Sequence, residues 1–180
     1  MSKVSNSTKN ISYIALCTAL ITVCSWIAVP ATVPFTLQTF AVAAAGGLLG
    51  AKRGTLSVVI YILLGAIGLP VFASFRSGAA VIFGTTGGYV LGFLFLALIS
   101  GFAAERFGRK MCVMIPSMLA GVAVCYAFGT AWYVCVYSAN TGSVGIMSVL
   151  LKCVFPFIIP DIIKITLAAL CVKKLSRFVK

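Results

Sequence analysis

The sequence has few charged residues and no histidine. Only 9% of its 180 residues are charged, and the two acidic residues are Glu105 and Asp161. An ordinary soluble domain carries about 25% charged residues. General acid–base catalysts and metal sites usually draw on His and carboxylates. We therefore predict that the chain is not an enzyme and holds no metal or cofactor.

The sequence also lacks paired cysteine motifs. None of its seven cysteines is spaced C-x-x-C, which leaves zinc-site and thioredoxin-like interpretations without support. The odd count, and positions inside apolar runs, favour small core residues or free thiols. A disulfide between two of them stays open at this point.

What the sequence has in excess is apolar residues, which make up 62% of the chain. A soluble domain of this size would have to leave much of that on its surface. We predict an all-α integral membrane protein with six transmembrane helices, in which residues 1–180 form a single transmembrane substrate-binding domain. The predicted spans are Ile11–Val29, Leu37–Gly50, Gly54–Leu69, Thr85–Ala104, Met111–Tyr137 and Ile146–Val172.

The distribution of basic residues predicts that both termini are cytoplasmic. With that orientation the cytoplasmic segments hold Lys3, Lys9, Lys52, Arg53, Arg106, Arg109, Lys110, Lys173, Lys174, Arg177 and Lys180. The outer connections hold only Arg76, in agreement with the positive-inside rule of a bacterial plasma-membrane protein. The first span resembles a signal peptide, but its apolar run exceeds the usual length of about 7–15 residues, and we expect it to be retained.

Two outer connections, Pro30–Gln38 and Pro70–Gly84, are unusually apolar for solvated loops. They are compatible with a lid or wall folded against the helix bundle. Anchoring of their aromatic side chains at the membrane interface explains the composition equally well.

Asp161 and Lys164 are the most informative pair in the chain. They stand three positions apart in the last predicted span, so they share one helical face. A charged group at the centre of a span costs about 2.5–3.5 kcal/mol and normally faces the bundle interior or a substrate path. A structural ion pair is the alternative. We favour a ligand site in which Asp161 accepts and Lys164 donates hydrogen bonds.

Three further residues have both an ordinary and a functional interpretation. Tyr89, near the outer end of the fourth span, is either a ligand contact or an interfacial tyrosine. Ala15 and Ala19 form a small-xxx-small face, which from spacing alone indicates ordinary packing within the bundle. An external docking surface is the other interpretation.

Four segments together resemble the BioY family, the biotin-binding S components of energy-coupling factor (ECF) transporters. They are VPFTLQTFAV (33–42), LLGAKRGTLSVVIYILLGAIGLPVFA (48–73), FGTTGGYVLGF (83–93) and PDIIK (160–164), and the resemblance extends over residues 11–175. One departure is Thr85, where the family often has proline. The resemblance implies six membrane helices with cytoplasmic termini and a biotin pocket near the outer face, closed by outer loops.

The resemblance also implies partners and residue roles. The implied partners are a transmembrane coupling subunit, reached through Ala15 and Ala19, and two ATPase subunits. The chain has no P-loop, so we expect that it does not itself hydrolyse ATP by that route. Asp161 and Lys164 would bind the ureido ring or the carboxylate of biotin, an assignment the sequence leaves open. The other candidate substrate-binding residues are Phe35, Phe75, Arg76 and Tyr89. The alternative function is a self-sufficient ion-coupled carrier that uses Asp161 as its coupling acid.

Overall fold

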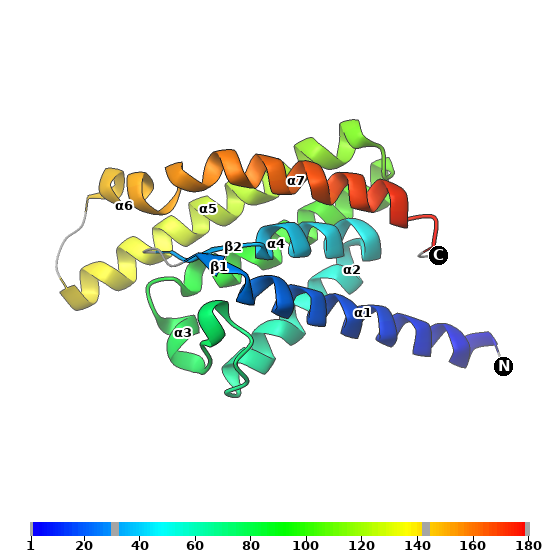
Figure 1. Ribbon diagram of the computed structural model, residues 1–180, viewed down its shortest axis with the longest axis horizontal. Coiled ribbons are helices and arrows are strands. Elements are labelled where there is room, and N and C mark those ends of the chain that lie inside the picture. Colours follow the sequence, from blue (N-terminus) through cyan, green and yellow to red (C-terminus); the bar gives the residue numbers. More distant parts are fainter. Residues whose placement is uncertain (1, 30–32, 142–144, 179–180) are drawn as a thin grey trace.

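The computed structural model describes residues 2–29, 33–141 and 145–178, and these are almost entirely helical (Figure 1). The helices are α1 Ser2–Trp26, α2 Gln38–Ala66, α3 Ala79–Phe83, α4 Gly87–Phe107, α5 Met111–Thr141, α6 Ile146–Cys153 and α7 Phe155–Leu175, with a 3-10 turn η1 at Ala73–Phe75. The described residues confirm the all-α prediction, and β1 (Ala28–Val29) and β2 (Phe35–Thr36) pair as a short antiparallel hairpin after α1. Part of the predicted loop Pro30–Gln38, and Lys180, lie outside the described residues.

The helix α2 is broken in its middle and folds back on itself. Gly50 has φ 85° and ψ 177°, which is not helical and which L side chains rarely adopt. The arms on either side lie so close that a Cβ added to Gly54 would stand 2.7 Å from the Cα of Gly46. The two predicted spans Leu37–Gly50 and Gly54–Leu69 are therefore the two arms of one helical hairpin, and the charged turn between them is confirmed.

The backbone groups freed by this break are bonded by side chains from elsewhere. The Arg109 guanidinium donates hydrogen bonds to the carbonyls of Gly47 and Leu48, each at 3.0 Å. The carboxylate of Glu105 accepts the backbone N–H of Ala51 at 3.1 Å. Unbonded backbone groups are costly at a membrane boundary, so Glu105 and Arg109 stabilise the hairpin.

The last predicted span is also divided. Val154, with φ −124° and ψ −56°, separates α6 from α7, and Pro156 stands at the start of α7. Of the described helices, α2, α4, α5 and α7 are long and apolar enough to cross a membrane. The count of six spans stays a prediction.

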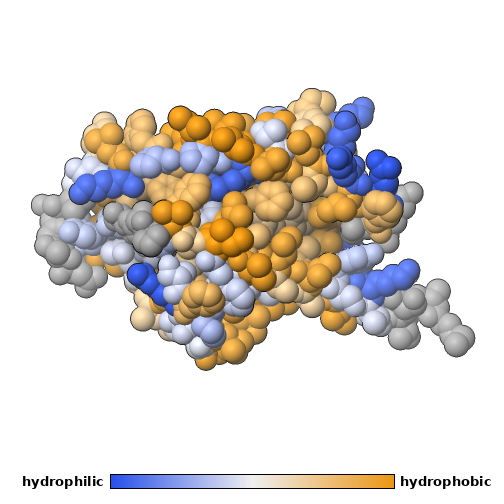
Figure 2. Space-filling view, in the orientation of Figure 1, coloured by the Kyte–Doolittle hydropathy of each residue, from blue (hydrophilic) through white to orange (hydrophobic). Residues whose placement is uncertain are grey.

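The arrangement of the helices separates a basic end from an apolar middle. The start of α1 and the end of α7 lie at the same end of the molecule (Figure 1). Hydrophilic side chains gather there, and a broad apolar band covers the middle (Figure 2). Large apolar side chains such as Leu16, Phe102 and Ile163 are more than half exposed. Lipid is the solvent that suits such a surface.

The core lies where α2, α4, α5 and α7 meet. Tyr61, Leu96, Met114 and Ile165 are fully buried there, one from each helix. All seven cysteines are free thiols. Beside this core, the β1–β2 hairpin and the adjacent parts of α4, α5 and α7 surround a hollow.

Candidate functional site

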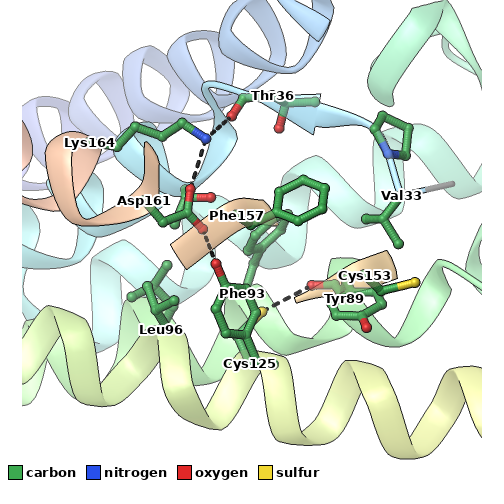
Figure 3. A pocket seen from close by; sticks show the side chains of 14 residues that line it. Val33, Thr36, Tyr89, Phe93, Leu96, Cys125, Cys153, Phe157, Asp161 and Lys164 are labelled. Atoms are coloured by element: carbon green, nitrogen blue, oxygen red, sulfur yellow. Dashed lines mark hydrogen bonds and ion pairs between the residues drawn. The ribbon is translucent and has the colours of Figure 1, made fainter. Parts of the chain in front are cut away.

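Two small adjoining cavities lie beside the β1–β2 hairpin (Figure 3 shows the first). The first cavity, of about 50 Å³, is closed by α4, α5, α6 and α7, and the second, of about 60 Å³, by α2, α4 and the segment around η1. Their common wall consists of Val33, Pro34, Thr36, Tyr89 and Phe93. Both predicted outer loops thus supply cavity walls, which supports the lid-or-wall interpretation.

Asp161 and Lys164 line the first cavity from α7. Their side chains form an ion pair with Nζ 2.8 Å from Oδ1, and only 3% of Asp161 and 5% of Lys164 is exposed. The spacing predicted that both residues share one face, and this is confirmed. A buried ion pair that faces a cavity places both a donor and an acceptor within reach of a ligand.

Lys164 also ties α7 to the β1–β2 hairpin. Its ammonium donates to the backbone carbonyl of Thr36 at 2.7 Å and stands 3.7 Å from the centre of the Phe35 ring (Figure 3 shows the first of these bonds). The ammonium therefore contacts Asp161, the Thr36 carbonyl and the face of the Phe35 ring at once. Phe35 lines neither cavity, and its ring packs on Phe157 at 5.8 Å.

Sequence reasoning missed Tyr126 of α5, which lines the first cavity. Its hydroxyl donates to Oδ2 of Asp161 at 2.5 Å, so both carboxylate oxygens have a partner. The apolar run of α5 contains three tyrosines, and nothing in the sequence tells which of them faces the interior. The packing of α5 against α7 is what brings Tyr126 next to Asp161.

Tyr89 lies at the junction of the two cavities, and 7% of it is exposed. Its hydroxyl is 3.2 Å from the hydroxyl of Thr130, and its carbonyl accepts a bond from the Cys125 thiol at 3.5 Å. These contacts fix the ring between α4 and α5. A buried position of this kind favours the ligand-contact interpretation over an interfacial tyrosine.

The loop around η1 separates two residues that were predicted together. Arg76 lines the second cavity, whereas Phe75 is 62% exposed and stacks on Trp26 with 5.1 Å between ring centres. Ser74 and Phe75 both have positive φ, 57° and 59°. Consecutive non-glycine residues in this region cost backbone energy, and here they turn Arg76 toward the cavity and Phe75 away from it.

The second cavity has its own polar groups. The amide of Gln38 donates to the hydroxyl of Tyr61 at 2.7 Å, and Thr86 completes this side with Arg76. Neither acidic residue pairs with Arg76, since Asp161 bonds Lys164 and Glu105 bonds the backbone of Ala51. The guanidinium thus supplies the uncompensated positive charge of the two cavities.

Ala15 and Ala19 lie far from this site, on the outside of the molecule. They line an apolar groove of about 470 Å³ between α1 and the second arm of α2, where Leu56, Ile60 and Leu64 form the opposite wall. The groove leaves these alanines accessible to another helix, so they do not serve close packing inside the bundle.

The chain resembles biotin transporters over nearly its whole length. The sequence model of the BioY family matches residues 1–180. The biotin transporter BioY of Thermotoga maritima is 42% identical over 161 residues, 89% of this chain and 91% of that protein. The biotin transporter BioY of Rhodobacter capsulatus is 32% identical over 186 aligned positions, 94% of each chain.

A solved structure has the same fold. It is the crystal structure of the S-component for biotin from an ECF-type ABC transporter, with a TM-score of 0.86 and 30% identity, over 96% of this chain and 93% of the other. These relatives are transport proteins rather than enzymes. Together with the four long apolar helices, they support a multi-pass membrane location for this chain. Its sequence, its fold and its relatives show that the chain belongs to the BioY family.

Proposed function

We propose that the chain captures biotin for uptake as the substrate-binding subunit of an ECF-type transporter. The observation that carries the proposal is the buried Asp161–Lys164 pair on the wall of a cavity. Its relatives bear the name of biotin transporters, and the similar solved structure is an S-component for biotin. The comparisons do not favour the self-sufficient carrier.

We propose that biotin spans both cavities, because they adjoin along a common wall and each offers polar groups for one end of the molecule. The ureido ring, with two N–H donors and a carbonyl, lies in the first cavity near Asp161 and Lys164. The carboxylate lies in the second cavity near Arg76, whose charge is uncompensated. The charge of Lys164 is already neutralised by Asp161, so Lys164 attracts the biotin carboxylate less strongly than Arg76 does. Tyr89 contacts the middle of the ligand. Phe35 does not touch the ligand but holds the Lys164 ammonium from behind, over the face of its ring.

Calorimetry on the detergent-solubilised chain tests this function and this orientation. Biotin should bind to the isolated protein, and Arg76→Gln should weaken biotin by about fivefold, since an exposed charge pair contributes about 1 kcal/mol. Biotinamide, whose tail is neutral, should bind Arg76→Gln and the unchanged protein equally. A chain that binds no biotin would refute the function, and equal losses for both ligands would refute the orientation.

We propose that residues 1–180 form one transmembrane substrate-binding domain that crosses the membrane six times with both termini cytoplasmic. The crossings would be α1, the two arms of α2, α4, α5 and α7. The basic residues Lys173 and Lys174 in the last turn of α7, at the end of the molecule where α1 begins (Figure 1), support this topology.

We also propose assembly with a transmembrane coupling subunit and two ATPase subunits. The groove beside Ala15 and Ala19 would receive a helix of the coupling subunit, because small residues let helices approach closely in lipid. Its apolar walls suit a membrane-embedded partner. Co-purification with such subunits tests the assembly.

A further inference from the structure

The chain has two tryptophans, and each holds one end of the outer connection Pro70–Gly84. The indole N–H of Trp26, at the end of α1, donates to the carbonyl of Pro70 at 2.9 Å. The indole N–H of Trp132, on α5, donates to the carbonyl of Gly84 at 3.0 Å. The connection between these two carbonyls supplies walls of the second cavity, although neither indole lines that cavity. The position of these walls therefore depends on side chains outside the cavity.

Arg76 lies closer along the chain to the end that Trp26 holds. Phe75, the residue before it, stacks its ring on Trp26 with 5.1 Å between ring centres and 26° between the ring planes. The hydroxyl of Ser25, next to Trp26, donates to the carbonyl of Val71 at 2.5 Å. The outer end of α1 thus holds the backbone that leads to Arg76 by one stacked ring and two hydrogen bonds.

The turn that carries Arg76 is strained. Ser74 and Phe75 have φ values of 57° and 59°, which cost backbone energy in residues with a side chain. Such a conformation persists only where contacts around it hold it in place. Because Phe75 is otherwise largely exposed, its stacking on Trp26 is the contact that meets this need. Without the stacked ring, the turn would relax and carry Arg76 away from the second cavity.

We propose that Trp26 is a positioning residue, which holds Arg76 at the second cavity so that its guanidinium binds the carboxylate of the ligand. Trp26 itself does not touch the ligand. This inference rests on the proposed function and on the orientation of biotin given there. Since Trp26 acts only through Arg76, its removal weakens a ligand with a negatively charged tail and spares a ligand whose tail is neutral.

Calorimetry with biotin and biotinamide tests this role. In Trp26→Leu, biotin should lose about threefold to fivefold, close to the loss expected for Arg76→Gln, and biotinamide should bind as it binds the unchanged protein. The double variant of Trp26→Leu with Arg76→Gln should bind biotin no more weakly than Arg76→Gln alone. The two changes remove one and the same interaction, so their effects should not add.

Phe75→Ala is a second variant, which removes the stacking partner and leaves α1 unchanged. It should show the same loss for biotin alone, and it decides the matter if Trp26→Leu does not fold. Phe75→Tyr keeps an aromatic ring and should restore normal binding. Phe83→Ala is the matched control, because Phe83 is 70% exposed on the same outer connection and lines neither cavity. It should bind both ligands normally, and gel filtration checks that each variant is folded.

Two results would overturn the inference while leaving the proposed function intact. One is normal biotin affinity in Trp26→Leu and in Phe75→Ala. The other is an equal loss for biotin and biotinamide in these variants, which would mean that the stacked rings support the whole pocket rather than Arg76. Normal biotin affinity in Arg76→Gln would refute the proposed orientation and this inference with it. Absence of biotin binding by the unchanged protein would instead refute the proposed function.

Discussion

Replacing Asp161 by Asn should weaken biotin binding strongly while the chain stays folded. The carboxylate holds Lys164 at 2.8 Å and Tyr126 at 2.5 Å, one through each oxygen. Asn keeps the shape and one acceptor, but it removes the charge that strengthens bonds to ureido N–H groups. It also leaves the buried ammonium of Lys164 without its counter-charge.

The contacts around the pair set the size of the effect. Hydrogen bonds to a charged group contribute about 1.5–3 kcal/mol, so the affinity should fall roughly 10- to 150-fold. Removing one partner of a buried pair costs about 3–5 kcal/mol of stability. Lys164 retains the carbonyl of Thr36 and the ring of Phe35 in this variant, so the loss of stability should lie near the lower end.

Lys164→Met should also weaken biotin, for a different reason. It removes the donor to the Thr36 carbonyl, so the β1–β2 hairpin is held to α7 less firmly, by the packing of Phe35 on Phe157 alone among these contacts. Calorimetry with detergent-solubilised protein measures both variants. Lys174→Met is the matched control, because Lys174 is exposed near the end of the same helix, and it should bind biotin normally.

The double change of Asp161 and Lys164 to Leu decides between a ligand site and a structural pair. Leucines often replace a buried ion pair without loss of stability, so this variant should remain folded. If the pair binds the ligand, biotin affinity should fall at least as far as in the single variants. Near-normal affinity in the double variant would refute the site.

Three further predictions concern topology, docking and the fold. In a chain freed of native cysteines, cysteine at Lys110 should react only with reagent from the cytoplasmic side and cysteine at Ser77 only from outside; the reverse pattern would contradict the predicted orientation. Ala15→Trp combined with Ala19→Trp should preserve biotin affinity but prevent co-purification with the coupling subunit, because bulk fills the groove; intact assembly would show that docking uses another surface. Gly54→Val should lower the melting temperature, since its Cβ meets the backbone of Gly46 at 2.7 Å and a backbone neighbour cannot rotate away; an unchanged melting temperature would mean that the arms of α2 separate easily.

Sequence reasoning succeeded where the geometry is local to one helix. The spacing of Asp161 and Lys164 fixes their common face without any knowledge of the fold, and the cost of burying charge indicates that the face points inward. The ion pair at 2.8 Å confirms this. The charged turn after Gly50 was likewise predictable, because Lys52 and Arg53 interrupt an apolar run.

Sequence reasoning failed where the position of a side chain depends on how each helix is rotated about its axis relative to its neighbours. A helix that is apolar all round carries no periodicity to tell its inner face from its lipid-facing side. Tyr126 and Tyr137 are therefore equivalent in the sequence, although only Tyr126 reaches Asp161. The position of Phe75 could not be predicted for a related reason, since the positive φ values of η1 that turn it onto Trp26 fall on ordinary residues without a sequence signal.

The two acidic residues are tolerated in this apolar chain for two different physical reasons. Asp161 is buried and its charge is balanced by Lys164, so it is tolerated inside the bundle only as part of a pair. Glu105 is exposed at the basic end, where it bonds the N–H of Ala51 at the start of the second arm of α2. A carboxylate at a helix N-terminus is favourable, and Gly50 creates such a terminus in mid-helix. The count of acidic residues does not explain the position of Glu105, but the break in α2 does.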